Sequence, residues 1–364
     1  MALDGGGIRG VVTARILQDV QEQIGKPLNQ YFDLIAGTST GSILAASIVL
    51  GKEPQELIEI YKERGQEIFN ASWLQKNLPF TTYIRGSKYS NEGLIKVLKE
   101  YLCHEKFGEI TLCQVSEISK AELLILAYDT LYRNTTFFTS RCPEKNRWFN
   151  NVKLWEVCVS SASAPTFFPP YEFKWTDPND PQKTEWKFPH IDGGVSANCP
   201  ALAALSHVIK VKNIDIEDIA ILSIGTGRTT HPLEYKEINN WGTVLWGLNV
   251  VDVFMGGQIQ MATDLCQEIL QRVNPDSYQR LQFNLNERFG KRTNEYSSCK
   301  LLPVEEQKNQ YINKKINEAM DDASKENIQN LLDATEAFVN SKSEVIKKFI
   351  KNNDPILQEP QLAT

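Results

Sequence analysis

The sequence predicts an α/β sandwich in which helices cover both faces of a mostly parallel sheet. Two segments of strand length, 123–128 and 219–224, are almost continuously apolar, with Ser223 as the one exception, instead of alternating with polar residues. Continuous apolar segments are typical of parallel strands that are buried on both faces. Segments with helical spacing separate them, and this alternation of strands and helices favours the same architecture.

The individual elements follow from the same patterns in chain order. We expect strands at 1–3 and 32–36, and each leads through glycines into a helix. The first strand would be shorter than central strands usually are, so the native chain is expected to carry further N-terminal residues. The polar segment 176–185 contains two prolines and is expected to be an exposed loop. The spacing of apolar residues predicts helices at 8–24, 40–50, 54–69, 91–102 and 198–210.

The length of 364 residues corresponds to one large domain or two ordinary ones. Strand patterns end near residue 235. We therefore expect an α/β domain at 1–235 and a helical extension at 236–364 that packs on it. Helical patterns in this extension lie at 241–272, 305–321 and 325–351.

Composition excludes several classes of protein. The chain has 39 basic and 45 acidic residues, and its net charge of −6 argues against a general nucleic-acid binder. Seven cysteines form no Cys-x-x-Cys pair, so we expect reduced thiols and a cytoplasmic protein. Asp4 and Arg9 interrupt any apolar run of a signal peptide. No pattern of acids or histidines indicates a metal, and no cofactor is expected.

The segment from Gly37 to Gly41 (GTSTG) lies between a predicted strand and a predicted helix. A serine at such a turn presents its hydroxyl to a cleft, and glycines on either side remove steric clashes. The positive end of the following helix favours an alkoxide at Ser39. This pattern indicates a nucleophile; a tight turn with a capping serine is the alternative.

A second glycine-rich segment runs from Asp4 to Gly10 (DGGGIRG). Consecutive glycines expose backbone N–H groups, which can stabilise an oxyanion or bind phosphate. Gly5, Gly7 and Gly10 also satisfy a dinucleotide-binding pattern. That alternative requires a second strand ending in an acid about twenty residues later, but a turn lies there (GKPLNQ).

The third motif is Asp192 followed by Gly193 and Gly194. Such an aspartate can reach a neighbouring site without obstruction, although an aspartate in a β-turn is also common. A Ser-His-Asp triad would need a histidine after the nucleophile. Of the four histidines, His231 stands where an α/β-hydrolase would have it, and a base other than histidine is the other option.

These three motifs, in this order, resemble the patatin-like phospholipase family. The family's glycine-rich oxyanion loop, nucleophile elbow and Asp-Gly-Gly motif match the segments at 4–10, 37–41 and 192–194. Two secondary matches lie at 160–170 (SSASAPTFFPP) and 223–227 (SIGTG). The resemblance covers about residues 1–230 and implies a three-layer sandwich.

The resemblance implies a Ser-Asp dyad without histidine, with Ser39 as nucleophile and Asp192 as general base. The expected activity is calcium-independent phospholipase A or a related lipid acyl hydrolysis at a membrane surface, with an activator left open. The alternatives are a triad esterase using His231 and a non-catalytic phosphate- or nucleotide-binding module.

The remaining site residues are assigned by the same resemblance. Arg9 is expected to orient the glycine loop or to contact a lipid phosphate, and helix packing is its alternative role. The expected oxyanion donors are the N–H groups of Gly5, Gly6 and Gly7, and the supporting glycines are Gly37, Gly41, Gly193 and Gly194.

Three apolar segments are candidates for lipid contact. Segment 68–80 is either a core helix or part of a mouth, and segment 241–261 is either the lining of an acyl tunnel or packed against the sheet. Near the C-terminus, apolar residues at 345–350 share a helical face that lysines surround. Such a helix either lies on an anionic membrane or docks on the protein.

Overall fold

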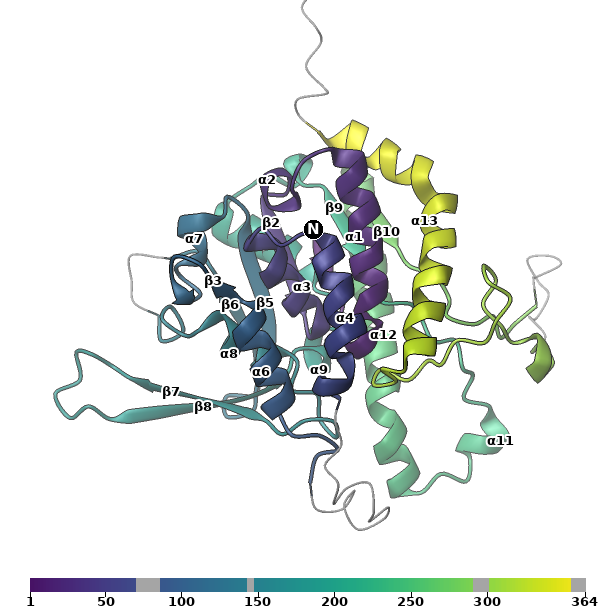
Figure 1. The fold of residues 1–364 in the computed structure, drawn as a ribbon, viewed down its shortest axis with the longest axis horizontal. Coiled ribbons are helices and arrows are strands. Elements are labelled where there is room, and N and C mark those ends of the chain that lie inside the picture. Colours follow the sequence, from purple (N-terminus) through teal and green to yellow (C-terminus); the bar gives the residue numbers. More distant parts are fainter. Residues whose placement is uncertain (70–85, 143–146, 291–300, 355–364) are drawn as a thin grey trace, which may run out of the picture.

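The computed structural model describes residues 1–69, 86–142, 147–290 and 301–354. Its centre is an eight-stranded sheet with the order β10-β9-β1-β2-β5-β8-β7, and β6 also pairs with β5 (Figure 1). The pairs among the first five strands of this order are parallel, and those of β5 with β6 and β8, and of β7 with β8, are antiparallel. The predicted α/β fold with a mostly parallel sheet is confirmed.

The strands have these bounds: β1 (Ala2–Leu3), β2 (Leu34–Thr38), β5 (Glu122–Asp129), β6 (Asn134–Thr139), β7 (Tyr171–Thr176), β8 (Glu185–Asp192), β9 (Ile221–Ile224) and β10 (Tyr278–Leu281). A separate two-stranded sheet pairs β3 (Cys103–His104) with β4 (Gly108–Glu109).

Among the described residues, the helices of four or more residues are α1 (Gly10–Ile24), α2 (Leu28–Tyr31), α3 (Thr40–Val49), α4 (Pro54–Ile68), α6 (Glu92–Tyr101), α7 (Val115–Ile118), α8 (Leu154–Ser161), α9 (Gly194–Ala197), α10 (Ala201–His207), α11 (Tyr235–Ile238), α12 (Thr243–Val273) and α13 (Lys325–Asn353), with a π-helical turn η2 (Val208–Lys212) after α10.

Alternate residues of the central strands face opposite helical layers, because successive side chains of a strand point to opposite faces. On one face, Leu3 and Ile125 belong to the main core with α1, α3, α4, α8 and α13. On the other face, Ala2 packs with residues of α10 and α12, and Leu124 packs beside α10. The sheet therefore lies between two layers of helices.

The long predicted elements agree with the structure, and the differences have physical reasons. The strands β6, β7 and β8 were not predicted, because these antiparallel strands at one side of the sheet mix polar and apolar residues. The tail also contributes β10, which is short and half polar. The predicted helix at 305–321 is wrong: only the turn Val304–Glu306 is helical there.

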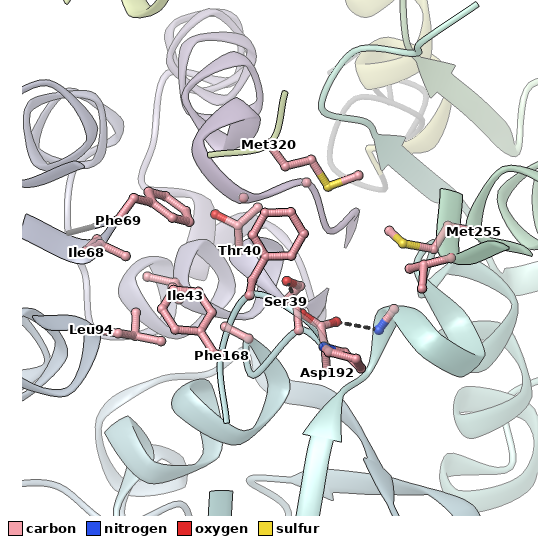
Figure 2. Close-up of a pocket in the computed structure, with 18 of the residues that line it drawn as sticks. Ser39, Thr40, Ile43, Ile68, Phe69, Leu94, Phe168, Asp192, Met255 and Met320 are labelled. Atoms are coloured by element: carbon pink, nitrogen blue, oxygen red, sulfur yellow. Dashed lines mark hydrogen bonds between the residues drawn. The ribbon is translucent and has the colours of Figure 1, made fainter. Parts of the chain in front are cut away.

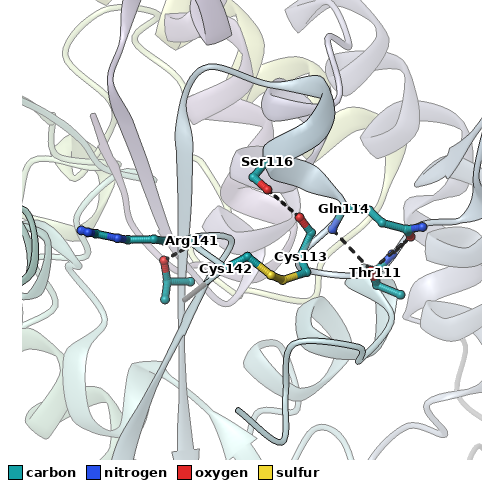
Figure 3. Close-up of a disulfide and its surroundings, with 7 residues drawn as sticks. Thr111, Cys113, Gln114, Ser116, Arg141 and Cys142 are labelled. Atoms are coloured by element: carbon teal, nitrogen blue, oxygen red, sulfur yellow. Dashed lines mark hydrogen bonds between the residues drawn. A yellow bond between two sulfur atoms is a disulfide. The ribbon is translucent and has the colours of Figure 1, made fainter. Parts of the chain in front are cut away.

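The expectation that all thiols are reduced is also wrong. Cys113 and Cys142 form a disulfide between the loop before α7 and the end of β6 (Figure 3). Their Cα atoms are 5.4 Å apart, which suits a disulfide. Disulfides persist in oxidising compartments, so the cysteine pattern no longer supports a cytoplasmic location.

The apolar face of the C-terminal helix α13 docks on the protein instead of remaining free. Ile346, Phe349 and Ile350 are buried in the main core. Lys348 pairs with Asp276 at 2.7 Å. Within the described residues, no helix combines the length and apolar character that a membrane crossing needs.

We expect that replacing Cys113 and Cys142 by serine lowers the free energy of unfolding by about 3 kcal/mol. The bond closes a loop across a sequence separation of 29 residues, and chain entropy in the unfolded state gives this magnitude. Urea unfolding of the oxidised protein measures it. Cys103→Ser, at an exposed free thiol, is the matched control and should leave the unfolding midpoint unchanged.

Candidate active site

Ser39 stands at a strained turn between β2 and α3. Its φ of 54° and ψ of −126° are unusual for a residue with a side chain. A Cβ atom on Gly37 would lie 2.2 Å from the carbonyl oxygen of Gly41, and one on Gly41 would lie 2.2 Å from that of Leu3. Only glycine fits at both positions, so the turn can hold Ser39 at the carboxyl edge of the sheet.

The side chain of Ser39 donates a hydrogen bond to Asp192. The Oγ to Oδ2 distance is 2.6 Å, although the two residues are 153 positions apart. Asp192 ends β8, opposite Ala127 of β5. Its other oxygen, Oδ1, accepts the N–H of Gly194 at 2.6 Å. These contacts fix the carboxylate beside the serine hydroxyl.

Burial changes the protonation of this pair. Asp192 is 5% exposed, and desolvation raises its pKa to about 7, although the hydrogen bonds from Ser39 and Gly194 act in the opposite direction. A carboxylate with this pKa is a far stronger base than an ordinary aspartate with a pKa near 4. The arrangement can therefore remove the proton of Ser39 near neutral pH.

A third side chain, Ser161 at the end of α8, orients the turn. Its Oγ accepts the backbone N–H of Ser39 at 2.9 Å and donates to the carbonyl of Leu126 at 2.6 Å. We did not assign this role from the sequence. In the sequence, the only indication of this role is that Ser161 belongs to the segment 160–170, which matches a motif of the family named above.

The glycine loop approaches Ser39 from β1. Both backbone groups of Gly5 are already engaged: its N–H donates to the carbonyl of Asn198 at 3.1 Å, and its carbonyl accepts from Thr226 Oγ1 at 3.0 Å. The N–H groups of Gly6 and Gly7 have no hydrogen-bond partner within the described part of the chain. Both glycines line the cavity beside Ser39.

The C-terminal tail supports this loop from behind. The N–H of Ile8 donates to the carbonyl of Met320 at 2.8 Å. Gly7 has a φ of +59°, and a Cβ atom there would lie 2.2 Å from that same carbonyl oxygen. The loop conformation therefore depends on a segment more than three hundred residues away in sequence.

A buried ion pair fixes the start of the glycine loop to β10. Arg280 Nη1 donates to Asp4 Oδ1 at 2.9 Å and to Ser223 Oγ at 2.7 Å, and its Nη2 also pairs with Asp4. The side chains of Arg280 and Asp4 are 12% and 1% exposed. The sequence gives no indication of this role for Arg280, because the strand pattern of β10 is too weak to align the arginine with Asp4.

Arg9 is buried behind the loop, and it is not among the residues that line the cavity. Its Nη1 donates weakly to the carbonyl of Glu318 at 3.4 Å. Burial lowers the pKa of its guanidinium, while Asp252 and Glu318 act in the opposite direction. This position agrees with support of the loop better than with contact to a lipid phosphate.

Ser39 and Asp192 open into one large, mostly apolar cavity of about 860 Å³ including its mouth. Figure 2 shows apolar side chains on one side of Ser39, and Met255 and Met320 across the cavity. Trp73, Leu74, Leu78 and Phe80 of the predicted mouth segment lie outside the described residues. The apolar side is formed by Ile43, Ile68, Phe69, Leu94 and Phe168.

None of the four histidines lines this cavity. His190 is buried, contacts Thr136 and the carbonyl of Phe188, and has a pKa that burial lowers. His207 contacts Glu122 at the opposite end of β5. His231 is exposed in the segment after β9, and His104 lies by the small sheet. Within the described residues, no group of three or more potential ligands could hold a metal ion.

Comparisons with known proteins point to one family. The family model described as patatin-like phospholipase matches residues 1–205. Patatin group J-1 of Solanum tuberosum is 29% identical over 313 residues, which cover 78% of this chain and 76% of that protein. Patatin-T5 of Solanum tuberosum is 30% identical over 276 residues, covering 68% and 66%. A solved structure, VipD from Legionella pneumophila, is 14% identical with a TM-score of 0.41, covering 93% of this chain and 66% of that chain.

We expect Arg280→Leu to lower the free energy of unfolding by about 3 kcal/mol, because it leaves the buried carboxylate of Asp4 uncompensated. The double variant Asp4→Asn/Arg280→Leu should lose clearly less, since no charge is then stranded. Chemical unfolding of the wild type, both single variants and the double variant gives the coupling energy. Additive losses would contradict the role assigned to the ion pair.

Proposed function

The chain belongs to the patatin-like phospholipase family, and on this premise we propose that it is a serine lipid acyl hydrolase of the phospholipase A type. Family membership supports the hydrolysis of lipid acyl esters in general. The observation that carries the proposal is the 2.6 Å hydrogen bond from Ser39 Oγ to the buried Asp192, at the wall of an apolar cavity.

In the first step, Ser39 Oγ attacks the carbonyl carbon of the ester and its proton passes to the carboxylate of Asp192. The tetrahedral intermediate then collapses. The bond to the alcohol oxygen breaks, and the proton on Asp192 moves to that oxygen, so that a lysolipid or other alcohol leaves. The fatty acyl group remains bound to Ser39 as an ester.

In the second step, Asp192 takes a proton from water as the water oxygen attacks the acyl carbon. Collapse of this intermediate releases the fatty acid, and the proton returns to Ser39 Oγ. The raised pKa of Asp192, about 7, supports both proton transfers near neutral pH.

The negative oxygen of each intermediate requires hydrogen-bond donors. The unpaired N–H groups of Gly6 and Gly7 lie in the cavity wall and supply them in this proposal. The N–H of Gly5 is engaged with Asn198, so we assign Gly5 to loop support instead of oxyanion binding. The helix dipole of α3, which begins beside Ser39, favours the same charge.

The apolar side of the cavity suits the fatty acyl chain. Phe168 and Ile43, both on that side, offer no partner for a polar group. In this proposal the substrates are phospholipids or related glycerolipids at a membrane surface, and the apolar lining supports it. The mechanism uses only groups of this chain, so activity is expected in excess chelator.

We expect Ser39→Ala and Asp192→Asn each to lower kcat/KM by at least about a thousand-fold, because each removes one half of the dyad. Release of fatty acid from phospholipid vesicles in excess chelator, together with hydrolysis of a soluble short-chain ester, measures the loss. His231→Ala is the control and should keep the wild-type rate. Loss of activity in that variant would favour a triad esterase. A phosphate or nucleotide that raises Tm without any ester hydrolysis would favour a binding module.

The rate should depend on pH through Asp192. Only the deprotonated carboxylate accepts the proton of Ser39, so log kcat/KM for the soluble ester should rise with pH and level off above about 7. Asp252 also lines the cavity, and burial raises its pKa. Asp252→Asn is therefore the control, and it should leave the midpoint unchanged. If the midpoint disappears in Asp252→Asn, the group that titrates is Asp252 and not Asp192.

A further inference from the structure

The long helix α12 exposes a set of large apolar side chains to solvent. We call this set the α12 apolar face. Phe254 is 62% exposed and Met261 is 67% exposed, which is far above the exposure of packed residues. The α12 apolar face consists of Trp246, Val253, Phe254 and Met261.

These four residues share one side of the helix. Trp246 and Val253 are seven residues apart, as are Phe254 and Met261, and at 3.6 residues per turn all four fall within about 100° of the circumference. The opposite side is anchored: Cys266 and Leu270 are fully buried against the second core, and Ile259 packs there. These packed residues follow Phe254 along the helix, so the C-terminal half of α12 is the part that is fixed to the core.

The region around the face carries almost no charge. Between Thr243 and Met261, Asp252 is the only ionisable side chain, and it contributes to the wall of the catalytic cavity. Several large apolar side chains exposed on one helix face without charges are typical of a contact site for a partner or a membrane.

The face is continuous with the mouth of the catalytic cavity. Val251 and Met255, which flank it on the same turns, line that cavity. Gln258 donates to the carbonyl of Val195 at 2.8 Å, and this bond holds α12 against α9, just after Asp192. In Figure 1 the N-terminal half of α12 projects past the sheet on the side where α9 lies.

We propose that the α12 apolar face inserts into a lipid surface and sets the cavity mouth against it. The proposal rests on the proposed function, because a cavity suited to an acyl chain opens beside the face. It commits to a membrane rather than a second copy of the chain, since the same turns of α12 serve both the face and the cavity wall. A copy bound there would cover the mouth through which lipid enters.

The chemistry of the face also defines the kind of membrane. The net charge of the protein is −6, and the face has no lysine or arginine. Apolar insertion, unlike the binding of a basic helix, does not need anionic lipid and is not screened by salt. Binding to vesicles of phosphatidylcholine alone should therefore persist at high salt.

The experiment measures flotation of the protein with vesicles. All variants carry Ser39→Ala, so that the vesicles stay intact. Phe254→Asp is expected to lower the bound fraction at least about ten-fold, because it places a charge where the proposal inserts an aromatic ring into the lipid. Ile209→Asp is the matched control: Ile209 is 41% exposed and lies in η2 before β9, at the opposite edge of the sheet. It should bind like the parent.

A second measurement separates membrane binding from the active site. Phe254→Asp with Ser39 intact should hydrolyse a soluble short-chain ester at the wild-type rate, and lose vesicle hydrolysis by the same factor as binding. Tm checks that the variant folds. If the Ser39→Ala parent floats but the protein with Ser39 intact cleaves no ester, the proposed function fails while membrane insertion of the α12 apolar face remains supported.

Three results would overturn the proposal. In the first, the Phe254→Asp variant floats with vesicles as well as its parent does. Binding could require phosphatidylserine and vanish at high salt, as for a basic surface. Sedimentation could reveal a dimer in the absence of lipid that Phe254→Asp dissociates, in which case a second copy covers the face.

Discussion

The site depends on a contact between backbones at the carboxyl edge of the sheet. A Cβ atom on Gly37, Gly41 or Gly193 would lie 2.2 Å from a carbonyl oxygen of a neighbouring segment. Because no side chain stands at these positions, β1, the β2–α3 turn and the end of β8 can approach closely enough to bring Ser39 within 2.6 Å of Asp192. The unfavourable φ of Ser39 persists only because these surrounding contacts fix it.

The same packing removes water from Asp192, and this has a consequence for stability. Its pKa is about 7 in the folded protein and near 4 in an unfolded chain. Between these values the folded state holds a proton that the unfolded state has released, so this residue's contribution to stability falls as pH rises and is lowest above pH 7. Burial thus makes the carboxylate a stronger base but lowers the stability of the folded protein. Such a trade-off is common where activity needs a destabilised group.

The sequence was sufficient for the central parallel strands and for Ser39 and Asp192 as candidate residues, because apolar runs and glycine motifs are local signals. It did not predict β6 to β8, whose polar residues hide the strand pattern. It also did not reveal Arg280, since the partner of a buried charge is set by strand register and not by spacing. The disulfide was missed for the same reason, because cysteine positions do not show which pairs meet in space.

Residues after 235 also contribute to the candidate site. The proposed catalytic groups lie within residues 1–205, the part that the family model matches. The groups that support and surround them come from beyond it: Arg280 holds Asp4, the carbonyl of Met320 supports the glycine loop, and Met255 closes the cavity. In the proposed function, the serine and the aspartate therefore come from the matched part of the chain, whereas support of the glycine loop and part of the cavity wall come from beyond it. Changes in α12 can alter which lipid surface the cavity meets while the serine and the aspartate stay in place.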